Sequence, residues 1–285
     1  MSAKTNQAVV PAVHELKVPG ASLYYEVRGS GPVLLFIAGG PADAGVFSDV
    51  AGRLADRYTV VTYDPRGNSR STLDGPAEDQ RIAVHADDAH RLLAELGAEP
   101  ACVLGSSGGA LVGLELAARH PEQVRTLVAH EPPALELLPD PARWRAFTQE
   151  VEDTNRTEGM FPAVMKFGEG VGLEPPPPPE GEPDPAEMEA MARIGGNMDF
   201  FFAHVLRSFG GFTPDVAALQ AGSTRIVLAG GAESRAKPHP AYQATVVMAE
   251  LLGTEVEHFP GQHGGFQTHA EPFAKKLHEV LEGRS

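Results

Sequence analysis

Ser107 is the residue of this chain best placed to act as a nucleophile. It is the central residue of Gly105-Ser106-Ser107-Gly108-Gly109, which satisfies the pattern G-x-S-x-G. In a chain with 31 glycines this pattern can arise by chance, so its position matters more than the match. The motif directly follows an apolar run and precedes a helical stretch, and a serine on such a strand-to-helix turn exposes its hydroxyl. The sequence therefore predicts a nucleophilic serine.

The residues around Ser107 suit the backbone of such a turn. A sharp turn of this kind is strained and tolerates only small neighbours. Four small residues meet this requirement: Gly105, Gly109, Ala110 and Gly113. The turn also directs the N-terminus of the next helix at the hydroxyl, where free N–H groups stabilise an oxyanion, with the Gly108 N–H as the first donor. The alternative is a glycine-rich turn that binds phosphate or only caps the helix.

A serine hydroxyl is a poor nucleophile at neutral pH and needs an adjacent base, for which histidine is the usual choice. Of the 11 histidines, His263 stands in a glycine-rich loop, Gly261-Gln-His-Gly-Gly265, just beyond the last predicted strand. The carboxyl end of the sheet would bring this loop near Ser107. His258 lies within that strand and His269 at the start of the last helix, so we expect both to serve packing or solvent contacts.

Short β-branched runs alternate with amphipathic helical stretches, which is typical of a largely parallel sheet with helices on both faces. Strands are predicted at residues 23–27, 33–37, 59–63, 101–104, 125–129, 225–229 and 255–259. Helices are predicted at residues 81–96, 108–119, 240–252 and 268–281. The segment Arg28-Gly29-Ser30-Gly31-Pro32 predicts a tight, hairpin-like turn between the first two strands, so that the sheet opens antiparallel.

The alternation stops between residues 134 and 223, where no run has the pattern of a strand and helical candidates lie at 141–155 and 199–209. We interpret residues 134–223 as a helical cap inserted into one core, formed by residues 1–133 and 224–285. The proline-rich residues 174–185 cannot be helix or central strand, because proline lacks the N–H donor. They are predicted to be a surface linker rather than a docking site for a proline-binding module.

Composition limits the partners and the compartment. The formal net charge of -15 argues against a nucleic-acid or anionic-membrane partner, which would be repelled, but it does not identify a partner. One cysteine, Cys102, excludes an internal disulfide and fits a reducing compartment. No signal-peptide pattern is found at the N-terminus, and no run approaches the ~20 apolar residues that cross a bilayer. We expect a cytoplasmic protein, of an oligomeric state that the sequence leaves open.

From about residue 14 to 283, the motif and the order of elements resemble the α/β-hydrolase superfamily. The resemblance implies a mostly parallel, eight-stranded sheet flanked by helices, with a helical cap. Members carry an oxyanion loop after the third strand, and Ala38-Gly39-Gly40-Pro41 occupies that place. The resemblance therefore implies the Gly40 N–H as the second oxyanion donor, with Ala38 where the family has a histidine that supports the loop. It also places the catalytic histidine at His263.

The acid that orients the histidine follows a strand between serine and histidine in this family. Glu233, in Gly230-Gly231-Ala232-Glu233 after the strand at 225–229, matches the usual place of the acid. Glu131 is the alternative, because it ends the preceding strand, where some members place their acid. The resemblance favours Glu233, and Glu131 would then anchor the entrance to the cap.

Two further groups of polar residues receive structural interpretations. The turn Asp64-Pro-Arg-Gly-Asn-Ser-Arg-Ser71 resembles the family's D-x-R-G-x-G-x-S turn, with Ser69 in place of the second glycine, and is expected to brace a loop. The group His85, Asp87, Asp88 and His90 has side chains of the metal-ligand type but no fixed metal signature, so a solvated helix face is expected. No metal and no cofactor are expected.

The sequence thus predicts a serine hydrolase that cleaves a small, hydrophobic ester, thioester or lactone through an acyl-enzyme on Ser107. Apolar cap residues either pack the cap helices on each other, which is the commoner role, or line an apolar pocket: Phe161, Met165, Met191, Met198, Phe200, Phe201 and Phe202. Relatives also use this triad for cofactor-free haloperoxidase or perhydrolase chemistry, and Gly39-Gly40-Pro41 resembles the loop of proline iminopeptidases. A non-catalytic ligand receptor on the same fold is the alternative from a different class.

Overall fold

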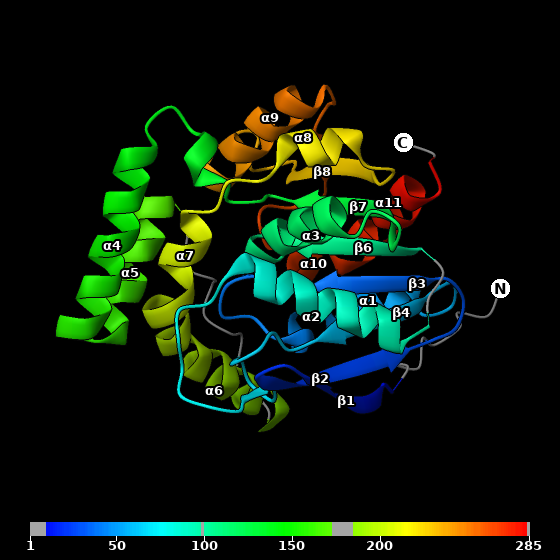
Figure 1. The fold of residues 1–285 in the computed structure, drawn as a ribbon, viewed down its shortest axis with the longest axis horizontal. Coiled ribbons are helices and arrows are strands. Elements are labelled where there is room, and N and C mark those ends of the chain that lie inside the picture. The colour runs from blue at the N-terminus through cyan, green and yellow to red at the C-terminus, as the bar shows by residue number, and fades with distance from the viewer. Residues whose placement is uncertain (1–9, 98–99, 173–184, 284–285) are drawn as a thin grey trace.

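The computed structural model describes residues 10–97, 100–172 and 185–283. The strands of this part of the chain are β1 (Ala12–Val18), β2 (Ala21–Arg28), β3 (Val33–Ile37), β4 (Thr59–Tyr63), β5 (Thr72–Leu73), β6 (Ala101–Ser106), β7 (Val124–His130), β8 (Arg225–Gly231) and β9 (Glu257–Phe259). They form one sheet in the order β1-β2-β4-β3-β6-β7-β8-β9, and the short β5 pairs with β2 (Figure 1). From β4 to β9 all neighbours in this order are parallel.

The prediction of a mostly parallel sheet that opens antiparallel is confirmed. The described sheet has nine strands rather than the expected eight, and the predicted hairpin between β2 and β3 is wrong. β2 pairs antiparallel with β1 and with β4, and β4 lies between β2 and β3. The hairpin is instead made by β1 and β2 across Pro19-Gly20, where Gly20 has a φ of 81°. β1 was not predicted because it is an edge strand whose first four residues are exposed, so it lacks an apolar run.

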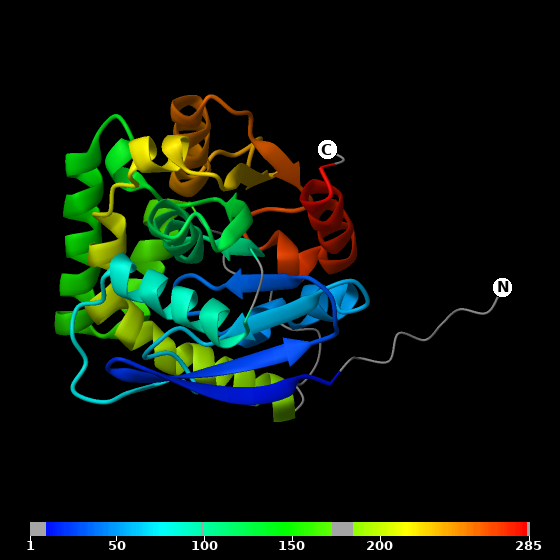
Figure 2. The same cartoon turned by 45° about the vertical axis from the view of Figure 1, so that its right-hand side comes forward.

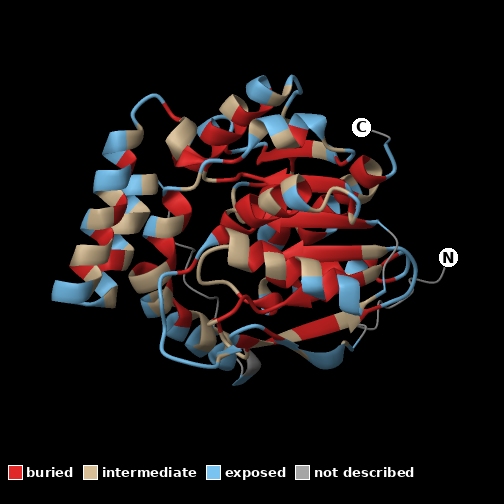
Figure 3. Cartoon of the chain, in the orientation of Figure 1, coloured by how far each residue is buried: buried red, intermediate tan, exposed pale blue. Residues whose placement is uncertain are grey.

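Both faces of the sheet are covered, which explains why its strands read as continuous apolar runs rather than alternating ones. Every residue of β6 is buried, and β3 and β7 are buried over most of their length (Figure 3). Successive residues point to opposite faces, so Leu35 and Val103 belong to one hydrophobic cluster while Leu34 and Cys102 belong to the other. The site-bearing strands are therefore fixed from both sides.

Helices cover each face. The helices α1 (Ser48–Leu54) and α11 (Ala270–Leu281) pack together on one face, while α2 (Ile82–Glu95), α3 (Gly108–Arg119) and α9 (Pro240–Leu252) lie on the other. The short helix α8 (Val216–Ala221) contacts α3 and α9, so it belongs to this second layer. The predicted helices of the sheet layers are thus present close to their expected positions.

Besides α8, four α-helices lie between β7 and β8 in the described part of the chain. They are α4 (Pro141–Glu158), α5 (Met160–Val171), α6 (Pro185–Phe200) and α7 (Leu206–Gly210). Figures 1 and 2 both show them gathered beyond one end of the sheet, the end to which the parallel strands point. A π-helical turn at Phe201–Val205 joins α6 to α7, so the stretch predicted as one helix at 199–209 is interrupted. The predicted linker at 174–185 lies outside the described residues except for Pro185, which begins α6.

Candidate active site

Ser107 occupies a strained turn between β6 and α3. Its φ of 55° and ψ of -126° lie in a region that residues with a side chain rarely adopt. Its backbone N–H donates to the His130 carbonyl at the end of β7 over 2.9 Å, and its own carbonyl accepts from Ala110 in the first turn of α3. The side chain is half-buried. A strained serine at the start of a helix is the backbone arrangement predicted for a nucleophile.

Steric contacts explain why glycines are required around Ser107. A Cβ on Gly105 would lie 2.4 Å from the Gly109 carbonyl oxygen, and a Cβ on Gly109 would lie 2.1 Å from the Ile37 carbonyl oxygen. Both distances are shorter than any side chain tolerates, and in both cases the obstacle is backbone. These two glycines therefore let β6, α3 and the end of β3 approach closely enough to form the turn.

The loop after β3 brings Gly40 beside the first turn of α3. A Cβ on Gly39 would lie 2.6 Å from the Gly108 nitrogen, and a Cβ on Gly108 would lie 3.6 Å from the Gly40 nitrogen. Gly40 has a φ of 59°, which favours glycine. Neither the Gly40 N–H nor the Gly108 N–H has a hydrogen-bond acceptor among the described residues. The two predicted oxyanion donors thus lie next to each other with their N–H groups unused.

Two asparagines hold this loop. Asn68 Nδ2 donates to the carbonyls of Gly40 (3.2 Å) and Ala42 (3.0 Å), and Asn197 Nδ2, from α6, donates to the Pro41 carbonyl (2.7 Å). Asn197 also accepts from the Ser69 N–H over 2.7 Å. These bonds supply the support that the family obtains from a histidine at the position of Ala38, and one of them comes from the helices beyond the sheet.

The turn at residues 64–71 has the contacts expected of a brace. The buried Asp64 carboxylate accepts from the Ala44 N–H and from the Arg70 backbone and guanidinium. Arg66 pairs with the buried Asp88 of α2 through two hydrogen bonds. Ser69, which replaces the second glycine of the family's turn, has a φ of 49°. The turn connects the oxyanion loop to α2 and presents no free nucleophile or base to the site.

His263 lies between β9 and the short helix α10 (Gly265–Thr268), in a loop whose Gly261 has a φ of 85°. A Cβ on Gly261 would lie 2.8 Å from both Gly265 and the His269 ring, so the loop is tightly folded. The His263 ring centroid lies 6.5 Å from that of His130, whose carbonyl binds the Ser107 N–H. His263 and Ser107 thus both lie next to His130, the last residue of β7, and the pairing of the two as base and nucleophile stays a prediction.

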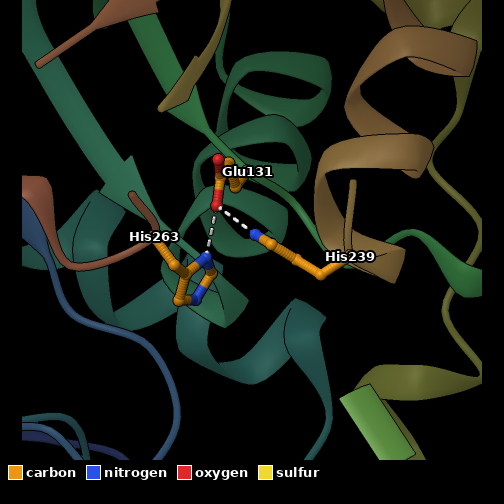
Figure 4. Close-up of side chains that lie close together, drawn as sticks. All are labelled: Glu131, His239 and His263. Carbon is orange, nitrogen blue, oxygen red and sulfur yellow. Dashed lines mark hydrogen bonds and ion pairs between the residues drawn. The ribbon is translucent and has the colours of Figure 1, made fainter. Parts of the chain in front are cut away.

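Glu131, and not Glu233, is the carboxylate that meets His263. Glu131 Oε2 lies 2.6 Å from His263 Nδ1, and Glu131 Oε1 accepts the Gly231 N–H over 2.8 Å (Figure 4). Glu131 is fully buried and has a φ of 48°, held by a bond from its N–H to the Ala229 carbonyl. This left-handed backbone turns the side chain from the end of β7 towards the loop after β9.

The expected pairing of Glu233 with His263 is absent from the structure. The Glu233 backbone N–H donates to the Gly261 carbonyl over 3.1 Å, so the residue is close to the histidine loop. Its side chain, however, is exposed to solvent. The loop that follows β8 thus contributes backbone contacts, while the carboxylate that meets His263 comes from Glu131, directly after β7.

The pKa of Glu131 reflects competing effects. Burial alone would raise it, but the imidazoles of His239 and His263, whose nitrogens lie 2.9 and 2.6 Å from Glu131 Oε2, outweigh burial and hold the pKa of this carboxyl well below its usual range. Glu131 is therefore ionised at neutral pH. An ionised, buried carboxylate beside Nδ1 keeps the proton of His263 on that nitrogen and leaves Nε2 as an acceptor.

His239 is a member of the site that the sequence did not reveal. Its Nε2 approaches Glu131 Oε2 to 2.9 Å, and its ring stands perpendicular to that of His263 at 5.3 Å between centroids (Figure 4). The residue caps α9 between Pro238 and Pro240, and its side chain is 10% exposed. Its place in the loop after β8, where the family's acid is expected, was the available signal.

Glu131, His239 and His263 are also the side chains most suited to a metal among the described residues, since their ligand atoms lie within 4.8 Å of one another. The 2.6 Å between His263 Nδ1 and Glu131 Oε2, however, is the length of a charge-assisted hydrogen bond. In the other group with side chains of the metal-ligand type, on α2, Asp88 pairs with Arg66, and His90 Nδ1 contacts Gln123 Oε1 at 2.7 Å. That group therefore does not converge on one point.

Apolar side chains from the helices beyond the sheet reach the two oxyanion donors. A Cβ on Gly40 would lie 3.9 Å from Phe201, and a Cβ on Gly108 would lie 3.2 Å from Phe209. Phe202 is buried as well, whereas three other predicted lining residues, Phe161, Met165 and Met191, are exposed. None of the described helices is long and apolar enough to span a bilayer.

Comparison with known proteins agrees with this architecture. The sequence profile described as "alpha/beta hydrolase fold" matches residues 32–159. The chain is 39% identical over 273 residues to YraK, an uncharacterized hydrolase of Bacillus subtilis, covering 94% of this chain and 95% of that protein. It is 34% identical over 147 residues to a 2-(acetamidomethylene)succinate hydrolase of Mesorhizobium japonicum, covering 48% of this chain and 51% of that protein.

Two solved structures show how far the fold is shared. A thermophilic esterase from Thermogutta terrifontis superposes with a TM-score of 0.73 at 18% identity, covering 97% of this chain and 98% of that chain. An enol-lactonase from Burkholderia xenovorans superposes with a TM-score of 0.69 at 18% identity, covering 94% of this chain and 100% of that chain. With a hydrolase matched over nearly its full length, these findings show that the chain belongs to the α/β hydrolase family.

Proposed function

We propose that this hydrolase cleaves a small, predominantly apolar ester, thioester or lactone through an acyl-enzyme on Ser107. The observation that carries the proposal is the 2.6 Å contact between His263 and the buried, ionised Glu131, next to a serine on a strained turn. Such a pair turns an imidazole into an oriented base, and the turn exposes the hydroxyl it would deprotonate.

In the proposed reaction, His263 takes the proton of Ser107 Oγ as the hydroxyl attacks the substrate carbonyl. The N–H groups of Gly40 and Gly108, which have no acceptor in the described structure, bind the oxyanion that forms. His263 then returns the proton to the leaving group. Water, deprotonated by the same imidazole, releases the acyl group and restores Ser107.

Glu131 acts by holding His263 in the productive tautomer and by stabilising the imidazolium that forms in each step. His239 in turn positions Glu131, because its Nε2 lies 2.9 Å from the same carboxylate oxygen. With Gly231 on the other oxygen, three groups fix this carboxylate. We assign Glu131 and His239 as positioning residues, since neither is placed to touch the substrate.

We further propose that the helices between β7 and β8 act as a cap over the site. Phe201 and Phe209 approach Gly40 and Gly108, so the helical layer supplies apolar surface directly beside the oxyanion donors. This supports an apolar substrate rather than a highly charged one. Because α8 packs on α3 and α9, we limit the cap to α4 through α7 and assign α8 to the core.

A fluorophosphonate probe tests the proposal. The purified wild-type protein should be labelled on Ser107, identified by mass spectrometry of peptides, and should hydrolyse short p-nitrophenyl esters. Ser107→Ala should lose both properties while keeping its melting temperature. The absence of label and of ester turnover in folded protein would overturn the proposal. Faster turnover of amino-acid arylamides than of any ester would replace it with a peptidase, and tight ligand binding without turnover would indicate a receptor.

A further inference from the structure

Two buried polar groups near the oxyanion loop have no hydrogen-bond partner in the described structure. They are the hydroxyl of Tyr63, at the end of β4, and Nε2 of His85, in the first turn of α2. Tyr63 is 1% exposed and His85 is 5% exposed. A buried donor or acceptor without a partner lowers the stability of the fold by about 1 to 3 kcal/mol. Such groups are therefore rare in folded proteins, and each one needs an explanation.

Both residues line the same small cavity. Its volume is about 10 Å³, and its walls include Gly39 and Gly40 of the oxyanion loop, Val112 of α3 and Phe209 of the cap. A space of this size admits one small group, comparable to a single water molecule. The residues of the orphaned hydroxyl and imidazole thus both belong to the wall of this cavity, although the two polar atoms themselves are almost completely covered.

The cavity adjoins the place where the substrate carbonyl would bind. Gly40 borders the cavity with its backbone and also supplies one of the two unused N–H groups. Phe209, another wall, lies 3.2 Å from the position of a Cβ on Gly108, the second donor. A carbonyl oxygen held by these donors would thus have the cavity as its neighbour.

A wider cleft borders the site at His239. His239, which contacts the triad carboxylate, also lines a cleft of about 430 Å³ together with Trp144 and Gln243. The leaving group must receive its proton from His263 and then depart, so the histidine side with the wide cleft suits it. The narrow cavity on the oxyanion-loop side suits the acyl portion, which stays bound to the serine.

The two unpartnered polar groups of the cavity wall are uncharged at neutral pH. Burial lowers the pKa of His85 to about 3, assisted by the nearby Arg66 guanidinium, and burial raises the pKa of Tyr63 well above its usual value. Arg66 itself is paired with Asp88. The cavity therefore offers neutral hydrogen-bonding groups and no free charge to compensate a carboxylate or an ammonium group.

We propose that Tyr63 and His85 form a polar subsite for a neutral hydroxyl or carbonyl group on a short acyl portion of the substrate. The proposal rests on the proposed serine-hydrolase function and deepens it by naming the substrate class. A site built from buried polar groups discriminates strongly against an analogue that leaves them unpaired, which a merely apolar pocket does not.

Matched acyl groups provide the test. Phenyl glycolate and phenyl propionate differ by a hydroxyl in place of a methyl group. Phenyl acetoacetate and phenyl 3-methylbutanoate form a second pair, which differs by a ketone oxygen in place of a methyl group. After division by the rate of alkaline hydrolysis, the wild-type kcat/KM should favour the polar member of at least one pair by about 10²-fold. Tyr63→Phe and His85→Leu should each reduce that preference about tenfold, and the double variant should abolish it.

Tyr25→Phe is the matched control, since Tyr25 is a buried tyrosine directly opposite Tyr63 on β2 and does not line the cavity. It should keep the wild-type preference. Both subsite substitutions remove an unpaired polar group, so the variants should melt no lower than the wild type. A wild-type preference near one for both pairs, or a preference that survives the double variant, would show that the cavity only holds a structural water and would overturn the proposal.

A binding experiment separates this inference from the proposed function. Ser107→Ala protein, which cannot turn over an ester, should gain melting temperature with glycolamide or acetoacetamide and not with propanamide or 3-methylbutanamide. The gain should vanish when Tyr63→Phe is added. Loss of labelling and turnover in the wild type would refute the hydrolase mechanism, whereas equal shifts for polar and apolar amides would refute the subsite.

Discussion

Glu131 Oε2 and His263 Nδ1 lie 2.6 Å apart although 132 positions separate the two residues in the sequence. The contact requires the left-handed backbone at Glu131 and the folded glycine loop around His263 at the same time. The contact favours Glu131 over Glu233 as the carboxylate partner of His263. The following predictions depend on this contact and on its neighbours.

Glu131→Gln should lower kcat for a short p-nitrophenyl ester by about 10² to 10⁴ with little change in KM, because the amide can favour the wrong imidazole tautomer and cannot stabilise the imidazolium. Glu233→Gln, which alters an exposed side chain in the neighbouring loop, is the matched control and should stay within about threefold of the wild type. Steady-state kinetics on both variants decide the assignment. A large loss in Glu233→Gln with an active Glu131→Gln would reverse it.

His239→Gln should move the acid limb of the kcat/KM profile to higher pH. Loss of the imidazole leaves the negative charge of Glu131 to His263 alone, which favours the protonated, inactive imidazolium. A merely structural role would lower the melting temperature and leave the profile where it is. The profile should be recorded between pH 4 and 9, and His258→Gln, which changes a histidine bonded to Tyr242 outside the site, serves as the control.

Asn68→Ala should lower kcat about tenfold while KM stays nearly constant, since the Gly40 carbonyl loses the bond that holds the oxyanion loop and the N–H of Gly40 matters most in the transition state. Asn155→Ala, on α4, should leave both constants unchanged. If Asn68→Ala raised KM by as large a factor as it lowered kcat, the substitution would weaken substrate binding in general. It would then not act mainly through the position of the Gly40 N–H.

Gly109→Ala and Gly52→Ala should have opposite effects on stability, although both glycines are in helices. The first substitution places a Cβ 2.1 Å from the Ile37 carbonyl oxygen and should cost about 3 kcal/mol or more, or prevent folding. The second meets nothing within 4 Å on α1 and should stabilise by up to about 1 kcal/mol. Urea unfolding measures both, and a neutral Gly109→Ala would refute the close approach of α3 to β3.

The stability contributed by Glu131 should depend on pH with a definite sign. Because its pKa in the folded protein lies below the usual 4.5, the ionised form is favoured by folding. The contribution is fully present above about pH 4.5 and is lost as pH falls below that value. The free energy of unfolding should thus exceed that of Glu131→Gln by about 3 kcal/mol at pH 7, with the gap narrowing towards pH 3. A constant gap would contradict this linkage.

The sequence revealed those features of the site that depend on local backbone chemistry. Ser107 and His263 stand among glycines that their tight turns require, and the strands that precede them are apolar runs long enough to recognise. The acid was not determined in this way, because Glu131 and Glu233 both follow strands and both loops come close to His263. The choice depends on the φ of Glu131, and a positive φ at a glutamate leaves no mark in composition.

Local sequence patterns also could not predict the order of the strands or the contacts between side chains that are far apart in the sequence. The turn at residues 28–32 was interpreted as a hairpin, yet β4 inserts between β2 and β3, which no property of that turn reveals. His239 contacts Glu131 from 108 positions away, and His85, assigned to a solvated helix face, is buried beside Phe209 instead. Each of these depends on how the layers pack.

Because Asn197 donates to the Pro41 carbonyl, α6 would support the proposed oxyanion donors as well as cover the site. Arg193, one turn earlier on the same helix, pairs with the buried Asp43 over 2.9 Å, and the ring of Phe200 fills the space that a side chain at Gly67 would take. Exchange of the cap with that of a relative would therefore replace residues that anchor the loop after β3, in addition to residues that contact the substrate. A chimaera should retain turnover only if the incoming helix rebuilds the Asn197 and Arg193 anchors.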